Sequence, residues 1–385
     1  MLSISRNLLA IAAFAITLTA CSEDFTSPIS NATDASEKNI YVVEFANSSD
    51  NSTLSVSGSP AVNQLLNDYN IDTKSVKFIY TSVLNGFAAE LSYDEMRKIA
   101  SDRRVKLVEA DVIQSSQGSD GDNVQAQSTP WGVTRVGSFA TATSNTGVAW
   151  VVDSGIDLDH PDLNVDVARS RSFVLTSPDN STADDLYGHG THVAGIIAAK
   201  NNTIGVVGVC ADATVIAVKV LNQYGSGRSS QTIAGLDYIA NNLVANKVNV
   251  VNMSLTGSIS TTVDNAVRAL AARGAKIAIA AGNYLANVSN YSPARVDANN
   301  VYTISAFSST SALASFSNYG LSVDFSAPGV SIYSCNKNGG YTTKSGTSMA
   351  APHFAGLLLA GNGSTNWNGF ITGDLDSAPD KISVR

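Results

Sequence analysis

The distribution of apolar residues divides the chain into segments of different character. Short, almost uninterrupted apolar runs recur in its second part, at 148–152, 215–220, 248–253, 277–281 and 301–304. Strands that are buried on both faces of a parallel sheet have this pattern. Stretches with helical periodicity lie between them, at 192–200, 230–243 and 263–273. This alternation predicts a doubly wound, mostly parallel α/β domain, whose ligands bind beyond the carboxyl ends of the strands.

A smaller unit precedes this domain. Runs rich in β-branched and aromatic residues predict strands at 39–45, 75–80, 86–91 and 105–112. Helical periodicity predicts helices at 61–69 and 92–101. In the second of these, Ser92 followed by Glu95 has the spacing of a capping box. The β-α-β-β-α-β order predicts a small α+β sandwich of the ferredoxin-like type.

Polar segments separate these units. Residues 22–38 are rich in Ser, Thr, Asp and Asn, and we interpret them as a tether. Residues 115–129 are rich in Ser, Gln and Gly, and segments of this kind are exposed and easily cut by proteases. The predicted organisation is therefore a leader, a tether, a small domain, a linker and a main domain, at 1–21, 22–38, 39–114, 115–129 and 130–385.

The leader has the features of an export signal. Arg6 precedes an apolar run that is too short to span a bilayer but suits the core of a signal peptide. The run ends in Leu18-Thr19-Ala20-Cys21, which resembles a bacterial lipobox. In that interpretation Cys21 is lipidated and becomes the first mature residue. An ordinary signal peptide cut near Ala20 is the alternative.

Composition excludes several classes of function. Apolar residues make up 44% of the chain, which is enough to fill a large core. The net charge of -8 argues against a nucleic-acid partner, because phosphate binding needs a basic surface. The three cysteines form no CxxC pair and the four histidines are scattered, so a structural zinc site is not expected.

Four motifs lie where the ligand crevice of the main domain is expected. Asp153 in VVDSGID and Asn283 in AAGN follow apolar strand patterns. His189 in GHGTHVAG and Ser348 in SGTSMAAPH stand at the starts of helices. Acyl transfer needs a nucleophile, a base, an acceptor that orients the base, and donors for the oxyanion. Ser348, His189 and Asp153 could supply the first three, although the residues alone leave His192 as another possible base.

Taken together in the order Asp, His, Ser, these motifs resemble those of the subtilases, in particular the proteinase K-like branch. The resemblance extends over roughly residues 130–361. It implies a serine endopeptidase that needs no cofactor for its chemistry. Asp153 would orient His189 as the base and Ser348 would be the nucleophile. Asn283 would line the oxyanion hole, and His192 would be structural.

The resemblance also implies a substrate cleft. Two segments are similar to those that flank an extended substrate strand in this family, and they comprise Gly225, Ser226, Gly227, Ser254, Leu255 and Thr256. Thr256 stands where the family usually has Gly. Ala281 and Gly282 would line the pocket for the side chain before the cut bond. Because Tyr284 brings no charge to this pocket, we expect a broad apolar preference.

Residues 38–115 resemble the subtilase propeptide, which assists folding and inhibits the enzyme until it is removed. This implies that the small domain is an inhibitory partner and that the chain cuts itself within 115–129. We therefore expect an exported precursor, anchored by Cys21 at a bacterial cell envelope, with membrane contact only through its lipid. Cutting would release a mature, extracellular monomer that acts on proteins or peptides.

Two further expectations concern stability. Asp324 resembles the carboxylate of a calcium position of the family, which the carbonyl groups of Asn299 and Val301 would complete. Cys210 and Cys335 are either small buried apolar residues or a disulfide, which an exported domain can form.

Two other classes of function compete with an active endopeptidase. A catalytically silent subtilase fold that only binds partners should lack part of the triad or Asn283, and all four residues are present. A hydrolase of small esters should carry a GxSxG motif with Ser before His in the chain, and the region around Ser348 lacks it. The sequence favours the endopeptidase.

Overall fold

The computed structural model describes residues 38–46, 59–116 and 126–385. The predicted leader with Cys21, almost all of the tether and most of the linker lie outside these residues. Within the described residues, no helix combines the length and the hydrophobicity that a membrane crossing requires.

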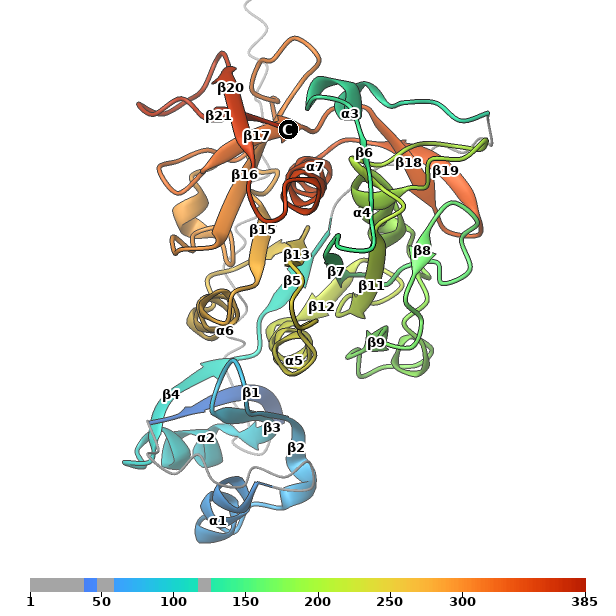
Figure 1. The fold of residues 1–385 in the computed structure, drawn as a ribbon. Coiled ribbons are helices and arrows are strands. Elements are labelled where there is room, and N and C mark those ends of the chain that lie inside the picture. Colours follow the sequence, from blue (N-terminus) through green and yellow to red (C-terminus); the bar gives the residue numbers. More distant parts are fainter. Residues whose placement is uncertain (1–37, 47–58, 117–125) are drawn as a thin grey trace, which may run out of the picture.

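The small domain is a four-stranded antiparallel sheet with two helices, and the predicted β-α-β-β-α-β order is confirmed (Figure 1). The strand order is β2-β3-β1-β4. The capping box is present, since Ser92 Oγ accepts from the Glu95 amide and Glu95 Oε2 accepts from the Ser92 amide. Its elements are β1 (Lys38–Phe45), α1 (Pro60–Asp68), η1 (Thr73–Ser75), β2 (Val76–Tyr80), β3 (Gly86–Ser92), α2 (Tyr93–Ala100) and β4 (Val105–Ala110).

The main domain is built on a ten-stranded sheet, and the predicted doubly wound α/β architecture is confirmed. The order is β20-β21-β17-β16-β15-β13-β7-β11-β8, and β9 also pairs with β11. All these neighbours are parallel except β20 and β21. The sheet strands are β7 (Val148–Asp153), β8 (Asn164–Val165), β9 (Arg171–Ser172), β11 (Thr214–Lys219), β13 (Asn249–Met253), β15 (Lys276–Ala280), β16 (Val301–Phe307), β17 (Phe325–Pro328), β20 (Asn366–Phe370) and β21 (Lys381–Val384).

Short pairs of strands and the helices complete the domain. The short strands are β5 (Ile113–Ser115), β6 (Ala140–Thr141), β10 (Cys210–Ala211), β12 (Ser226–Arg228), β14 (Thr256–Gly257), β18 (Ile332–Asn336) and β19 (Gly340–Lys344). The helices are α3 (Trp131–Arg135), η2 (Asp179–Ser181), α4 (His189–Ala198), α5 (Ser229–Asn241), α6 (Thr261–Ala272), η3 (Val288–Asn290) and α7 (Thr347–Ala360).

Alternation along the central strand β7 explains the two cores of the main domain. Every residue of β7 is buried. Ala149 and Val151 pack into the core that contains α4 and α7. Their neighbours Trp150 and Val152 point to the opposite face, into the core that contains α5 and α6. Helices therefore cover both faces of the sheet, as Figure 1 shows.

The sheet of the small domain is also covered on both faces. Val43 and Phe87 face α1 and α2 and form the domain's own core. Val42, Tyr80 and Ala88 are buried in the α5–α6 core of the main domain. One face of the small domain's sheet is thus buried because helices of the main domain pack against it.

One predicted strand has other bounds in the structure, and the last residues form strands that were not predicted from the sequence. The strand expected at 105–112 ends at Ala110, and β5 then leaves the small domain and pairs with strands of the main domain. The last residues of the chain form β20 and β21, which extend the large sheet beyond β17. Both features arise from contacts between segments that are far apart in the sequence.

Candidate active site

Asp153 and His189 are in direct contact. Asp153 is the last residue of β7 and His189 the first of α4, and both side chains are fully buried. His189 Nδ1 lies 2.8 Å from Asp153 Oδ1 and 3.0 Å from Oδ2. His189 Nε2 has no hydrogen-bond partner among the described residues. A carboxylate on Nδ1 leaves Nε2 as the nitrogen that can exchange a proton with a substrate or nucleophile.

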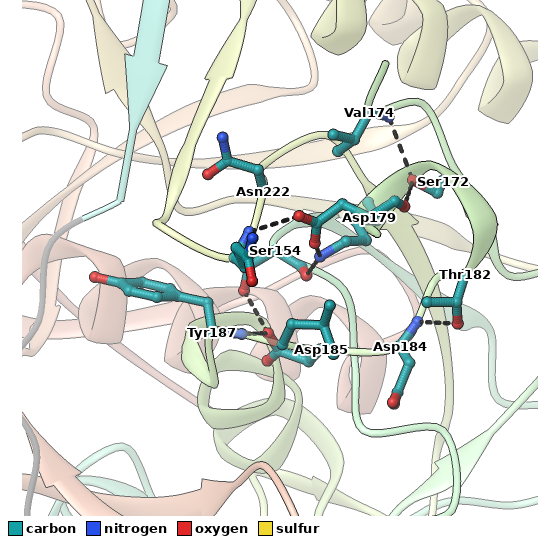
Figure 2. A network of polar contacts seen from close by, with 12 residues as sticks. Ser154, Ser172, Val174, Asp179, Thr182, Asp184, Asp185, Tyr187 and Asn222 are labelled. Carbon is teal, nitrogen blue, oxygen red and sulfur yellow. Dashed lines mark hydrogen bonds and ion pairs between the residues drawn. The ribbon is translucent and has the colours of Figure 1, made fainter. Parts of the chain in front are cut away.

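A polar network holds the loop before His189 (Figure 2). The carboxylate of Asp185 accepts from the backbone amides of Tyr187, Gly188 and Thr191. Ser154, which follows Asp153, donates its hydroxyl to the same carboxylate at 2.9 Å. The network links the end of β7 to the start of α4, so it holds in place the backbone that carries Asp153 and His189.

A buried ion pair lies beside this network. Lys219, at the end of β11, is 2.9 Å from Asp179 and also donates to the carbonyl oxygen of Ser154. Both side chains of the pair are almost completely buried. Breaking a buried pair leaves an uncompensated charge, so these contacts restrain the turn that follows Asp153.

Ser348 is the second residue of α7 and is almost completely buried. Its Oγ donates to the carbonyl oxygen of Ser254 at 3.3 Å, and Ser254 Oγ donates to the carbonyl oxygen of Ser348 at 2.8 Å. The first amides of a helix have no acceptor within it, so the Ser348 amide is a donor at the helix N-terminus. No hydrogen bond joins Ser348 to His189 in this arrangement of the described residues. Such bonds often tighten only when substrate binds.

Asn283 lies against the start of α7 and its orientation is fixed. Its Oδ1 accepts from the Thr347 amide at 2.8 Å and from Thr347 Oγ1 at 2.9 Å. Thr347 Oγ1 in turn accepts from the Gly282 amide. Because its carbonyl end is occupied, Asn283 can offer its amino group to the pocket that it lines together with Ser348.

This pocket is lined by part of one predicted cleft segment, Leu255 and Thr256, and by none of Gly225, Ser226 and Gly227. Leu255, Thr256, Gly282 and Ala280 line it, as does Ser115 of β5, together with Asn283, Thr347 and Ser348. Ala281, which the sequence suggested, is instead fully buried, and its carbonyl oxygen accepts from Asn318. The walls carry no charged side chain.

β5 is held as a strand in the cleft that leads to Ser348. It pairs antiparallel with β12 on one side and with β14 on the other. The Ser116 amide continues this pairing by donating to the carbonyl oxygen of Gly225 at 2.9 Å. Figure 1 shows β5 rising from the small domain into the main domain. Both predicted cleft segments therefore bind an extended chain through their backbones, with Ser226 opposite Ser115 and Thr256 also opposite Ser115.

Comparisons with known proteins agree with this geometry. A profile described as "Subtilase family" matches residues 143–360, more than half of the chain. The chain belongs to the subtilase family. A profile described as "Peptidase inhibitor I9" matches residues 40–115. The protein is therefore a subtilisin-like serine protease with an inhibitor propeptide, and the predicted family and enzyme class are confirmed.

Named relatives support the assignment. The "Alkaline serine exoprotease A" of Vibrio alginolyticus is 37% identical over 77% of this chain, which spans only 54% of that protein. The "Alkaline serine protease ver112" of Corniculantispora psalliotae is 37% identical over 73% of this chain and 72% of its own length. The "Extracellular serine proteinase" of Thermus sp. is 38% identical over 76% and 70%.

A solved structure has the same fold. It is described as the "Crystal structure of a cold adapted subtilisin-like serine proteinase" and has 34% sequence identity and a TM-score of 0.56. The match covers 66% of this chain and 96% of that structure. The subtilase fold therefore accounts for the main domain, and the small domain is additional to it.

Two other histidines of this subtilase, His192 and His353, are held within the fold. His192 Nε2 lies 3.1 Å from the carbonyl oxygens of Ile332 and Thr342, and burial keeps its pKa well below the ordinary value. His353 Nδ1 contacts the carbonyl oxygen of Met349, and burial lowers its pKa to about 4. These contacts make His192 a structural residue, whereas His189 contacts Asp153.

Some residues of the site were not singled out from the sequence. Thr347 lies within a recognised motif, but its link to Asn283 depends on a contact over 64 positions. Asn318 is fully buried and accepts from the amides of Tyr284 and Ala286 through Oδ1. It thereby holds the segment after Asn283. No motif or spacing signalled this role.

The cysteine pair expected as a possible disulfide is not formed. Cys210 on β10 and Cys335 on β18 are both free and buried in the α4–α7 core. Burial raises the pKa of the Cys210 thiol to about 12, and it also raises the pKa of the Cys335 thiol. Both behave as small apolar side chains, which was the other interpretation.

The calcium candidates contain a single carboxylate. Asp324 Oδ2 accepts from the Thr303 amide at 2.8 Å. Although Asp324 as a whole is exposed, desolvation of its carboxyl group and the nearby Asp297 raise its pKa to about 6. Asn299 and Val301 flank Asn300, whose φ is +69°. In the part of the chain that the structure describes, no three His, Cys, Asp or Glu residues are grouped to hold a metal.

Proposed function

We propose that this subtilase is a serine endopeptidase that acts through Asp153, His189 and Ser348 and is made as a self-processing precursor. The observation that carries the proposal is β5, which lies as a third strand between β12 and β14 and leads toward Ser348. A chain bound in this way through its backbone presents a peptide bond to the site whatever its sequence. A cleft of this kind suits the interior of a polypeptide rather than a small ester.

The acylation step uses the contacts of the site. His189 Nε2 takes the proton of Ser348 Oγ as the oxygen attacks the peptide carbonyl. Asp153 holds Nδ1, keeps the ring in the required tautomer and stabilises the imidazolium that forms. His189 then gives the proton to the leaving amine. Water follows the reverse path and releases the acyl group from Ser348.

Charge that develops on the carbonyl oxygen meets two donors. The Ser348 amide is at the N-terminus of α7, and the amino group of Asn283 is set by the two contacts of its Oδ1 with Thr347. Donors that are fixed before the reaction stabilise an oxyanion without reorganisation at the moment of reaction. We therefore assign Asn283 to the oxyanion hole.

The small domain acts as the inhibitory propeptide, and the predicted boundaries 39–114, 115–129 and 130–385 remain our proposal. β5, which follows the last strand of the small domain, lies in the cleft, so a segment bound like a substrate would inhibit the precursor. Cutting within 115–129 would separate the two domains covalently. The uncharged pocket supports a broad apolar preference for the residue before the cut bond.

Export and anchoring rest on the sequence, since those residues lie outside the described part. We propose a signal peptide at 1–21 with lipidation of Cys21, a precursor at a bacterial cell envelope and an extracellular mature enzyme. The Thermus relative named as an extracellular proteinase supports export. The mature domain would act as a monomer on protein or peptide substrates.

Calcium would serve stability and not the reaction. One carboxylate with backbone carbonyls is a suitable oxygen set for Ca²⁺. Desolvation and Asp297 raise the pKa of the Asp324 carboxyl group, and a cation beside it would lower that pKa by favouring the ionised form. We propose that Asp324, with the carbonyls of Asn299 and Val301, would hold it near the start of β16.

Ser348→Ala tests the proposed function. The full-length wild-type chain should lose its small domain on expression and then degrade casein. The variant should accumulate as the uncut precursor with no activity. Ser377→Ala, at an exposed serine outside the site, is the matched control and should mature normally. A Ser348→Ala chain that is still cut in purified form, or a wild-type chain that never cleaves casein, would refute the proposal.

A further inference from the structure

The helix that carries the nucleophile contains a proline. α7 spans Thr347–Ala360, and Pro352 stands inside it. In an α-helix the carbonyl oxygen of each residue accepts from the amide of the fourth residue that follows. For Ser348 this fourth residue is Pro352, and proline has no amide hydrogen. The carbonyl oxygen of Ser348 therefore lacks its helical donor, although the residue is almost completely buried.

Ser254 supplies a donor in place of the missing amide. It directly follows β13, it is fully buried, and its Oγ donates to the carbonyl oxygen of Ser348 at 2.8 Å. A buried carbonyl group without a donor is costly, so the hydroxyl group of Ser254 stabilises the backbone of α7 at the nucleophile. In the opposite direction, Ser348 Oγ donates to the carbonyl oxygen of Ser254.

Asn252 determines the direction of the Ser254 hydroxyl group. Its side chain is fully buried, and its Nδ2 lies 2.9 Å from Ser254 Oγ. A hydroxyl group has one hydrogen, and Ser254 gives it to Ser348, so Ser254 Oγ accepts from Asn252. The neighbours Val251 and Met253 lie in the α5–α6 core, so alternation along β13 places Asn252 on the face that α7 covers.

Both sides of Ser348 are held by these contacts. On the N-terminal side, Asn283 Oδ1 accepts from the amide and the hydroxyl group of Thr347. On the C-terminal side, Ser254 holds the carbonyl group of Ser348. Together the two contacts restrict the backbone torsions that decide where Ser348 Oγ and the Ser348 amide lie. A displacement of about 1 Å in an active site can lower a rate about 100-fold.

We propose that Ser254 is a positioning residue, whose hydroxyl group replaces the helix hydrogen bond that Pro352 cannot make and thereby positions the nucleophile. Asn252 acts through Ser254 by directing that hydroxyl group. Neither side chain takes part in the proton transfers. The inference rests on the proposed function, because it concerns the position of Ser348 during acylation. Ser254 would thus serve the nucleophile through its side chain as well as lie in the predicted cleft segment.

Ser254→Ala tests the role of the hydroxyl group, because it removes the donor and keeps the backbone of the cleft. The mature enzymes are compared with a fluorogenic peptide after titration of their active sites. The kcat value should fall about 10- to 100-fold, whereas KM should change less than about threefold. Ser383→Ala is the matched control, because Ser383 is also fully buried and donates to a backbone carbonyl group, that of Ser326. This control should keep kcat within about twofold of the wild-type value.

Pro352→Ala gives a readout that a general loss of packing would not give. Alanine restores an amide at position 352, which can donate to the Ser348 carbonyl oxygen within the helix. In the Ser254→Ala background, Pro352→Ala should therefore raise kcat at least about fivefold. Two changes that only loosen the packing would instead lower kcat together. A double variant whose kcat exceeds that of Ser254→Ala by less than about twofold would overturn the proposal.

The remaining outcomes separate this inference from the proposed function. If the wild-type enzyme cleaves the peptide and Ser254→Ala keeps kcat within about threefold, the inference alone is overturned. If Ser254→Ala yields no folded enzyme, Asn252→Leu decides, because it keeps the Ser254 hydroxyl group and removes the group that directs it. Its kcat should fall about three- to tenfold and recover with Pro352→Ala, and an unchanged kcat would overturn the inference. A wild-type chain that cleaves neither casein nor peptide would overturn the proposed function itself.

Discussion

Glu109 of the small domain binds the N-terminus of α6 in the main domain. Its Oε1 accepts from the Thr261 amide at 2.9 Å. Its Oε2 accepts from the Thr262 amide at 2.9 Å, from Thr262 Oγ1 at 2.6 Å and from Ser260 Oγ at 3.1 Å. The first amides of a helix lack partners within it and favour a negative charge. Glu109 should therefore slow the release of the small domain after cutting.

Glu109→Gln removes the charge and one acceptor. If the Gln carbonyl takes the place of Oε2, three contacts remain, and the amino group then faces the Thr261 amide. A hydrogen bond to a charged group contributes about 1.5–3 kcal/mol and the helix dipole about 0.3–1 kcal/mol. Because the Thr261 amide is exposed, water compensates part of the loss. We expect about 1.5–2.5 kcal/mol, or roughly 10- to 70-fold faster dissociation.

The assay follows the appearance of activity. The cut complex is purified and diluted into a fluorogenic peptide, and the rate at which hydrolysis accelerates reports the departure of the small domain. Glu90→Gln, at an exposed glutamate of the same domain that pairs with Lys77, is the matched control. The reasoning is refuted if Glu109→Gln changes the rate less than threefold, or if Glu90→Gln changes it equally.

Two further predictions concern the oxyanion hole and pH. Asn283→Ala should lower kcat/KM about 100- to 1000-fold with an unchanged number of titratable active sites, and a loss of less than threefold would exclude Asn283 as a donor. Burial, chiefly, raises the pKa of Asp111, which accepts from Ser230 at the start of α5. The complex therefore binds a proton more tightly than the separated small domain, so dissociation should accelerate as pH rises from about 4 through the raised pKa. Asp111→Asn should remove this pH dependence in the same assay, and an equal dependence in the variant would contradict it.

The apolar patterns predicted the strands of the large sheet because that sheet is buried on both faces. A strand such as β7, with no exposed residue, leaves an uninterrupted run that polar positions do not obscure. The ends of such strands also place Asp153 and Asn283 at one edge of the sheet. The contact between Asp153 and His189 followed from the motifs, since both sit at the boundaries of regular elements.

Other features could not be predicted from the sequence. Residues 113–115 (IQS) have no strand pattern, and their strand exists because β12 and β14 offer free edges more than 100 positions away. The burial of Gln114 has the same origin. The disulfide expectation was wrong because sequence carries no information on whether Cys210 and Cys335 approach with suitable geometry.

The double covering of the small domain's sheet has a consequence for activation. When this domain departs, Val42, Tyr80 and Ala88 lose the helices that bury them. A domain of this size has little stability to spare, so release and unfolding become coupled events. An unfolded chain is what the freed protease can cut best. The inhibitor would thus be destroyed by the enzyme it leaves, and activation would proceed in one direction only.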